Sequence, residues 1–355
     1  MTSSSPFCVV GICGYSGSGK TTLIEEIVSE LRAGGFRVGV LKHTPHSLSL
    51  DAEGKDTERF YRAGADYVFA HDAHQAFARY PDSAGRLQDF LSRFPSSLDL
   101  VLVEGHKKAG LPGIWITAGT GEDRKRPEQS QKKVVSRDDP RYFGAVMEHI
   151  HQELAKCHSG RRVMAGLLIG GKSMRMGTDK ALLRIGGELF AERSYRTLGE
   201  VAAKTVLLGS AELPGPLGRA DRLPDVSGVR GPMAGILGAF RWGPESAWIM
   251  SAVDMPFMDK EAWEWVLGHR RPGVWAVLPL LKRGAKAETM AACYEPNIFG
   301  AVESLAKAGI STLQELTHHP KVITPLVPKS LARAWKNVNT IAEWKRANRL
   351  LDKRP

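Results

Sequence analysis

Cysteines and long hydrophobic runs are scarce in this sequence. The cysteines are Cys8, Cys13, Cys157 and Cys293. They have neither Cys-x-x-Cys spacing nor the density of a disulfide framework, so we expect buried, reduced thiols. No stretch approaches the roughly 20 apolar residues that cross a bilayer, and Met1 to Pro6 lack the basic n-region of a secretory signal. These absences predict a cytoplasmic protein without a membrane segment.

A nucleic-acid reader motif is also missing, although basic residues exceed acidic ones. The 49 lysines and arginines against 38 acidic residues give a formal charge of +11. They are scattered, with local clusters only at Arg124 to Arg126, Lys132-Lys133 and Arg161-Arg162. No basic stripe is interleaved with aromatic residues. This pattern favours polyanionic small molecules over nucleic acid as ligands.

The length and the order of apolar segments indicate two α/β domains. A chain of 355 residues exceeds what one hydrophobic core usually holds. Short apolar runs alternate with amphipathic segments along both halves, which is the rhythm of βαβ units. The polar segment Lys156 to Arg162 separates the halves. We therefore assign residues 1–157 and 162–355 to two doubly wound, three-layer α/β domains.

Periodicity places the individual elements. Strands are predicted at Phe7 to Ile12, Phe36 to Leu41, Tyr67 to Ala70, Leu98 to Val103, Val163 to Ile169, Thr205 to Leu208, Ala247 to Val253, Val274 to Leu278 and Thr289 to Tyr294. Helices are predicted at Thr21 to Arg32, Lys55 to Ala63, Gly85 to Phe94, Phe143 to Ala155, Phe190 to Val201 and Asn297 to Lys307.

The first glycine-rich segment, Gly14 to Thr21, fits the P-loop pattern G-x-x-x-x-G-K-[ST]. It follows a predicted buried strand and opens a predicted helix. Backbone amides there cradle phosphates, the lysine neutralises phosphate charge and the hydroxyl ligates Mg²⁺. The nucleotide-binding candidates are Gly14, Gly17, Ser18, Gly19, Lys20, Thr21 and Thr22. The first domain is therefore predicted to be a P-loop NTPase domain.

Glu104 directly follows the apolar run Leu98 to Val103. P-loop proteins place a second carboxylate beside the metal at such a strand end. Thr21 and Glu104 are therefore the metal candidates of this domain. The alternative for Glu104 is an exposed acid that ends a strand.

The first half resembles the P-loop accessory protein family of molybdopterin-guanine dinucleotide synthesis. The segments that carry the resemblance are Gly14 to Thr21, Arg37 to His43, Gly54 to Asp56, Arg62 to Ala65 and Leu102 to Gly105. It covers residues 7 to about 155. The resemblance implies a GTP-binding, weakly GTP-hydrolysing domain that dimerises and assists a partner transferase. His106 stands where the family usually has a bulky apolar residue.

A second glycine-rich, basic segment, Leu168 to Ala181, follows another apolar strand but does not fit the P-loop pattern. Arg175 and Lys180 can stabilise charge on a triphosphate as its α-phosphate is attacked and pyrophosphate leaves. Asp254 ends a later apolar strand, at the edge where open α/β sheets bind ligands. It is the candidate Mg²⁺ ligand of this half. The alternative for Asp254 is a strand-capping role.

The second half resembles the molybdenum cofactor guanylyltransferase family from residue 163 to about 350. The motifs are the loop Leu168 to Lys180, Pro224-Asp225, Gly231 to Gly235, the Asp-x-Pro strand end, and Asn337 to Thr340. The family joins GMP from GTP to the terminal phosphate of molybdenum-loaded molybdopterin. The resemblance implies a Rossmann-like nucleotidyltransferase domain with Arg175, Lys180 and Asp254 as catalytic residues. It implies nucleotide contacts at Leu168, Ile169, Gly170, Gly171, Lys180, Asp225 and Asp254.

Two residues depart from the family pattern. Ile169 replaces a small residue, and Gly209 stands where an Asn commonly contacts the nucleotide. The pair Gly170-Gly171 favours guanine, because the related cytidylyltransferases usually have alanine first in that pair.

Both halves point to one pathway, so the leading hypothesis is a transferase fused to its GTP-binding assistant. A fusion raises the effective concentration of each for the other. The expected ligands are Mg²⁺, GTP and molybdenum-loaded molybdopterin, with cofactor-insertion proteins and a homodimer through the first domain as further partners. Three alternatives stay open: transfer of CMP to the same pterin, transfer of a nucleotide to a sugar phosphate, and a non-catalytic adapter that delivers cofactor to apo-enzymes.

Overall fold

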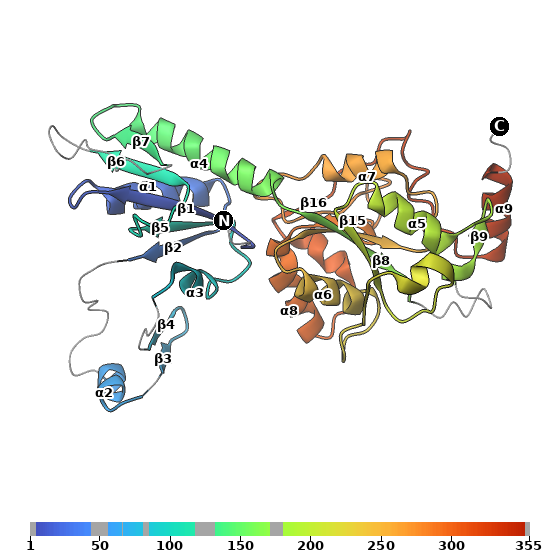
Figure 1. Cartoon of the computed structure of the whole chain (residues 1–355), viewed down its shortest axis with the longest axis horizontal. Coiled ribbons are helices and arrows are strands. Elements are labelled where there is room, and N and C mark those ends of the chain that lie inside the picture. Colours follow the sequence, from blue (N-terminus) through green and yellow to red (C-terminus); the bar gives the residue numbers. More distant parts are fainter. Residues whose placement is uncertain are drawn as a thin grey trace.

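The computed structural model describes residues 5–43, 56–65, 67–80, 85–117, 132–170 and 180–351. These residues form two α/β units that follow one another along the long axis of the molecule (Figure 1). Each unit has one main sheet with buried apolar clusters on both faces. The predicted pair of three-layer α/β domains is thus confirmed. None of the helices in this described part of the chain is long and apolar enough to cross a membrane.

The first sheet is wholly parallel, with the strand order β2-β5-β1-β6-β7. Its strands are β1 (Cys8–Gly14), β2 (Val38–Lys42), β5 (Leu100–Glu104), β6 (Gly113–Thr117) and β7 (Lys133–Ser136). Helices α1 (Lys20–Ala33) and α4 (Tyr142–Ser159) cover one face, and the short α3 (Leu87–Leu91) packs on the other. Residues on both faces of β1 and β5 are buried, which explains their unbroken apolar sequence.

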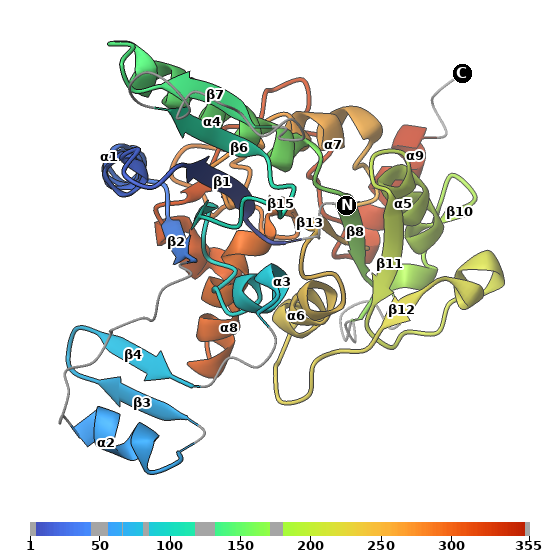
Figure 2. The ribbon, with the colours of Figure 1, turned by 60° about the vertical axis from the view of Figure 1, so that its left-hand side comes forward.

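A small group of elements lies apart from the main sheets (Figure 2). It consists of α2 (Asp56–Arg62), β3 (Val68–His71) and β4 (Ala76–Arg79), and its two strands pair only with each other. The strand predicted at Tyr67 to Ala70 therefore exists, but the prediction that it continues the doubly wound sheet is wrong. In the described part of the chain, neither strand of this group pairs with a strand of the main sheet, and several of its aromatic side chains are therefore exposed to solvent.

The second sheet has the order β12-β11-β8-β13-β15-β14-β16. Its strands are β8 (Val163–Leu168), β11 (Lys204–Leu208), β12 (Arg222–Leu223), β13 (Ala247–Ala252), β14 (Ala276–Val277), β15 (Ala291–Tyr294) and β16 (Val322–Ile323). Only β15 runs against its neighbours. One face carries α5 (Phe190–Gly199), α7 (Lys260–Leu267) and α9 (Ile341–Leu351), and the other carries α6 (Pro232–Trp242) and α8 (Phe299–Lys307). A hairpin of β9 (Arg184–Ile185) and β10 (Glu188–Leu189) precedes α5.

The segment between the two units is shorter than the sequence suggested. The helix predicted to end at Ala155 continues to Ser159, and β8 begins at Val163. Arg161 lies between them with its side chain only 8% exposed. His158 and Arg161 of this polar segment therefore turn into a buried junction, while Lys156, Ser159, Gly160 and Arg162 are exposed.

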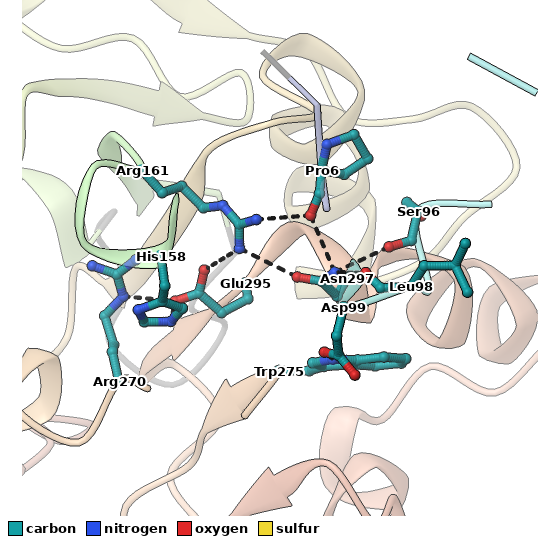
Figure 3. A network of polar contacts seen from close by, with 10 residues as sticks. All are labelled: Pro6, Ser96, Leu98, Asp99, His158, Arg161, Arg270, Trp275, Glu295 and Asn297. Atoms are coloured by element: carbon teal, nitrogen blue, oxygen red, sulfur yellow. Dashed lines mark hydrogen bonds and ion pairs between the residues drawn. The ribbon is translucent and has the colours of Figure 1, made fainter. Parts of the chain in front are cut away.

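Buried polar groups join the two units (Figure 3). Glu295, directly after β15, is 2% exposed. Arg161 donates to Oε2 of Glu295 at 2.9 Å and Arg270 donates to Oε1 at 2.6 Å. His158 Nε2 lies 3.2 Å from the same Oε1. Arg161 also donates to the carbonyl of Pro6 in the first unit at 2.8 Å.

Asn297 and Asp99 complete the junction (Figure 3). The side-chain amide of Asn297 donates to the carbonyls of Pro6, Ser96 and Leu98 in the first unit. In the other direction, the carboxylate of Asp99 accepts from Trp275 Nε1 at 2.6 Å and from Lys321 Nζ at 2.9 Å. Because buried polar groups are costly unless paired, these contacts hold the two units in one orientation.

The junction lies at the amino ends of the parallel strands in both sheets. Pro6 precedes β1 and Asp99 precedes β5, while Arg161 precedes β8 and Lys321 precedes β16. The carboxyl ends of the parallel strands therefore face away from each other. Each residue of β5 and β13 adds about 3.3 Å along its strand, so the carboxyl edges of the two sheets are roughly 40 Å apart or more.

Candidate nucleotide sites

The P-loop connects β1 to α1 at the carboxyl edge of the first sheet. Gly17 and Gly19 have φ values of +76° and +81°, left-handed conformations that favour glycine. Gly19 is the N-cap of α1, so the backbone amides of the first turn point toward the loop. Lys20 Nζ donates to the carbonyl of Tyr15 at 2.5 Å, across the loop. Partial burial lowers the pKa of Lys20, while Glu104 acts against that shift.

The two metal candidates of the first unit lie side by side. Thr21 Oγ1 donates to Glu104 Oε1 at 3.4 Å. Lys42, at the end of β2, places Nζ 3.3 Å from Glu104 Oε2 and 3.5 Å from Thr21 Oγ1. A cationic group thus already sits between a hydroxyl and a carboxylate. This donor set fits Mg²⁺, which takes hydroxyl and carboxylate oxygens in P-loop proteins.

Sequence reasoning gave no role to two basic residues at this site. One is Lys42, which directly follows the strand predicted at Phe36 to Leu41. Lys42 reaches Glu104 because β2 lies beside β5. The other is Arg137, which follows β7 and donates from Nη1 to the carbonyl of Gly19 at 3.3 Å. Neither has a local motif, because strand order alone brings them to the loop.

Two histidines also meet at this edge. His43 follows β2 and His106 follows β5, and their ring centroids are 4.4 Å apart. His106 has a φ of +46°. Burial, and then the neighbouring His43, lower the pKa of His106. The departure from the family pattern at His106 therefore places a second imidazole ring against His43, tilted by 34°.

A cleft of about 930 Å³ opens at the carboxyl edge of the second sheet. Its lining combines strand ends and the segments that follow them: Leu168, Ile169, Gly170, Lys180, Leu208, Ser210, Asp225, Gly231, Pro232, Ala252, Val253, Asp254, Met255, Lys286, Ala287, Glu288, Thr289, Met290, Gln314, Asn337 and Asn339. The structure thus brings the predicted residues of several distant motifs into one cavity.

Charged and amide groups converge in the middle of this cleft. Lys180 Nζ donates to Asp254 Oδ2 at 2.9 Å and to Asn339 Oδ1 at 2.5 Å. Val338 N donates to the backbone carbonyl of Asp254 at 2.9 Å, which ties the late Asn-Val-Asn segment to the end of β13. An ammonium and a carboxylate are thereby fixed side by side in the cleft, where a phosphate group can bind against the ammonium.

The donor set in this cleft also fits a hard cation. Asp254 supplies a carboxylate, and Asn337 Oδ1 is buried without a hydrogen-bond partner. Carboxylate and amide oxygens are the ligands that Mg²⁺ prefers, together with water and substrate phosphates. In the described part of the chain no group of three His, Cys, Asp or Glu side chains surrounds a metal position. A cation here would therefore depend on the substrate for part of its coordination.

Comparisons with known proteins match both units. Residues 9–136 match the model of molybdopterin guanine dinucleotide synthesis protein B, and residues 165–323 match the MobA-like NTP transferase domain. A probable molybdenum cofactor guanylyltransferase of Opitutus terrae is 31% identical over 189 residues, 51% of this chain and 89% of the relative. The chain belongs to the molybdenum cofactor guanylyltransferase family.

The first unit adds a molybdopterin guanine dinucleotide synthesis protein B domain to this guanylyltransferase-family chain. The molybdopterin-guanine dinucleotide biosynthesis adapter protein of Haemophilus influenzae is 44% identical over 110 residues. The match covers 30% of this chain and 62% of the adapter, so the chain spans less than two thirds of that relative. The match to the solved structure of molybdopterin-guanine dinucleotide biosynthesis protein A from Archaeoglobus fulgidus covers 54% of this chain and 100% of that protein, with a TM-score of 0.46 and 23% identity.

Most of the nucleotide contacts inferred from the guanylyltransferase family line the cleft. Leu168, Ile169, Gly170, Lys180 and Asp225 do so together with Asp254. Gly171 and Arg175 lie outside the described residues.

The departure from the guanylyltransferase family at Gly209 has a local counterpart. Gly209 has a φ of +109°, and a Cβ there would lie 3.2 Å from Gly170 N. A side chain would therefore press on the backbone of the glycine-rich loop. The second departure, Ile169, is 1% exposed and belongs to the apolar cluster beneath the cleft. The larger side chain at this position therefore packs among the apolar residues of that cluster.

Proposed function

We propose that residues 162–355 transfer GMP from GTP to molybdenum-loaded molybdopterin, and that residues 1–157 form a GTP-binding accessory domain. The observation that carries this proposal is the meeting of Lys180 and Asp254 within one cleft at the carboxyl edge of β8 and β13. The name of the Opitutus terrae relative supports the choice of substrates. The expected cytoplasmic location belongs to the same proposal.

In this mechanism an oxygen of the terminal pterin phosphate attacks the α-phosphorus of GTP. A new phosphoanhydride bond forms, the bond from the α-phosphorus to the bridging oxygen breaks, and pyrophosphate leaves. The chain supplies no nucleophile. Lys180, held by Asp254 and Asn339, presents its ammonium to the charge that develops on the phosphate oxygens. Arg175 is proposed as a second cation for the same charge.

Magnesium is the proposed metal at both sites. In the cleft Asp254 would hold it, with the unpartnered Asn337 Oδ1 as a further oxygen. In the first domain Thr21 and Glu104 would hold it. Bound there, Mg²⁺ supplies positive charge to phosphate oxygens.

Product analysis tests the proposed function directly. Purified protein is mixed with Mg²⁺, molybdenum-loaded molybdopterin and either GTP or CTP, and the released cofactor is identified by mass spectrometry. We expect a guanine dinucleotide from GTP. A cytosine product from CTP would keep the mechanism and overturn the base assignment, whereas no product from either nucleotide would favour a non-catalytic adapter.

The accessory site is tested by Lys20→Ala. We expect this substitution to abolish GTP hydrolysis by the first domain, because Lys20 is the loop's phosphate-facing cation. Transfer should only be reduced, since the transferase cleft lies at the opposite end of the molecule. Separate assays of phosphate release and dinucleotide formation measure the two effects. Equal loss of both activities would contradict independent sites.

The P-loop and the transferase cleft lie at carboxyl edges that face away from each other. We therefore predict that the P-loop domain of one chain assists the transferase domain of another chain. Neither site can reach the other within one chain, so adding an Asp254→Ala chain, which keeps its P-loop, should raise transfer by the Lys20→Ala chain. The control is addition of a chain that carries both substitutions. A mixture no more active than Lys20→Ala alone would show that assistance passes through the junction within a chain.

A homodimer through the first domain completes the proposal. The group of α2, β3 and β4 exposes four aromatic side chains, with Phe69 and Phe77 on opposite faces of its hairpin, and large exposed apolar surface marks protein contacts. They are Phe60, Tyr67, Phe69 and Phe77, between 42% and 72% exposed. We expect sedimentation to give a dimer and the double substitution Phe69→Ser with Phe77→Ser to give a monomer. The matched control is Trp242→Ser, which removes an exposed aromatic on α6 of the other unit and should leave the dimer intact.

A further inference from the structure

A half-buried carboxyl group in the cleft has no role in the transfer mechanism. Glu288 lines the same cavity as Asp254 but lies on another element, three residues before β15. Since β15 runs antiparallel to β13, the residues before it lie beside the carboxyl end of β13. Glu288 therefore faces the reacting centre from the β15 side of the sheet.

Strand order divides the cleft into two halves. Three lining residues lie on the side of β11: Gly170 after β8, Asp225 after β12 and Gly231 directly before α6. Glu288 and Met290 belong to the side of β15, and β13 with Asp254 lies between the two sides. If the glycine-rich side holds GTP, the β15 side is left for the second substrate.

The backbone around Glu288 is held firmly. Glu288 N donates to the carbonyl of Pro279 at 2.7 Å. The side chain of Gln314 donates to the carbonyl of Ala287 at 2.7 Å, and the hydroxyl of Tyr294 donates to that of Thr289 at 2.6 Å. The backbone that carries the carboxyl group is therefore preorganised for contact with a bound molecule.

Within the described residues no side chain forms a hydrogen bond or ion pair with this carboxyl group. Burial, and next the charge of Asp254, raise the pKa of Glu288. A partly buried carboxylate without donors is unfavourable, and a ligand with two neighbouring N–H groups would satisfy it. Met290, half-buried beside it, offers an apolar surface to a flat ring.

We propose that Glu288 recognises the 2-amino-4-oxo edge of the pterin ring of the second substrate. This edge presents an N–H and an adjacent amino group, which match the two oxygens of a carboxylate. Guanine has the same edge, but the strand order places Glu288 across β13 from the glycine-rich loop. The inference rests on the proposed function, and it makes Glu288 a specificity residue for the acceptor.

The test exchanges the hydrogen-bonding pattern of residue 288 without changing its size. Binding of pterin and of lumazine, which has a 2-oxo group in place of the 2-amino group, is measured by their fluorescence. We expect wild-type protein to prefer pterin. Glu288→Gln should weaken pterin binding roughly 10- to 100-fold and reverse the preference, because an amide donates to the 2-oxo group and accepts from the ring N–H.

Kinetics supply the second measurement. Glu288→Gln should raise KM for molybdenum-loaded molybdopterin and leave KM for GTP and the Mg²⁺ dependence unchanged. Glu315→Gln, at an exposed glutamate next to Gln314, is the matched control and should change neither preference nor KM. A raised KM for GTP would assign Glu288 to guanine, and a shifted Mg²⁺ dependence would assign it to the metal.

An unchanged pteridine preference, or no pteridine binding by the wild type, overturns the inference. Failure of the proposed function is distinguishable, since it appears as the absence of any dinucleotide from wild-type protein. The pterin and lumazine binding measurement does not depend on that reaction.

Discussion

Asp254→Ala is expected to abolish dinucleotide formation, with a loss of roughly 1,000-fold or more in kcat. The carboxylate holds Lys180 at 2.9 Å and is the proposed metal ligand, so its removal withdraws two sources of charge stabilisation at once. Single-turnover assays with GTP and molybdenum-loaded molybdopterin measure the loss. GTP hydrolysis by the first domain should be retained.

The fold should survive this substitution. Asp254 lies at a strand end with its side chain 22% exposed, and its backbone contact with Val338 does not involve the side chain. Asp221→Asn is the matched control, because Asp221 is 61% exposed and pairs only at the surface with Lys204. Circular dichroism and thermal unfolding check the fold. Transfer by Asp254→Ala at more than a tenth of the wild-type rate would remove Asp254 from the catalytic centre.

Glu295→Ala is expected to cause the largest loss of stability, about 3–5 kcal/mol in the free energy of unfolding. The substitution leaves the guanidinium groups of Arg161 and Arg270 buried without their carboxylate. Because Arg161 also binds Pro6 in the other unit, we expect the two units to unfold in separate transitions. Urea denaturation and scanning calorimetry measure both effects.

The control for the junction is Glu264→Gln, which removes a surface ion pair with Lys260 from a side chain 58% exposed. Such pairs contribute about 0–1 kcal/mol, so the change should be small. If the two glutamate variants were equally stable, the junction would not be a source of stability.

The same carboxylate predicts the acid sensitivity of the junction. Burial by itself would raise the pKa of Glu295, but the hydrogen bond from His158 and the charges of Arg270 and Arg161 hold it well below its usual range. A depressed pKa stabilises the folded state at neutral pH. That contribution declines as the pH falls below the unfolded value of about 4.3. Glu295→Ala should therefore lose less stability on acidification than the wild type.

Local patterns predicted the two nucleotide loops and their surroundings. The P-loop is recognised from the eight residues Gly14 to Thr21, because glycine conformation, helix start and the lysine are all properties of one short segment. The Asp254 strand end is read in the same way, since an apolar run followed by an acid indicates the carboxyl edge of a sheet. The structure brings the described residues of each predicted site together, while Gly171 and Arg175 lie outside the described residues and the roles of all of these residues stay predictions.

Strand order decided what the sequence did not. Lys42 and Arg137 reach the P-loop only because β2 and β7 take their places in the first sheet. Glu288 reaches the cleft only because β15 turns back against β13. No periodicity in a single strand reports which neighbour it pairs with, since the pattern records only which of its faces are buried.

The sequence by itself determined the two α/β units, the position of each glycine-rich loop after a strand and the family resemblance of each half, because these depend on residues close together in the chain. The tertiary structure alone decided that the units meet at the amino ends of their sheets and that their sites face apart. Long-range contacts such as Arg161 with Glu295 and Asn297 with Pro6 set this arrangement, and each of these pairs is separated by more than a hundred residues in the sequence. Burial of these polar groups is favourable only in one relative orientation, since each requires its specific partner across the junction.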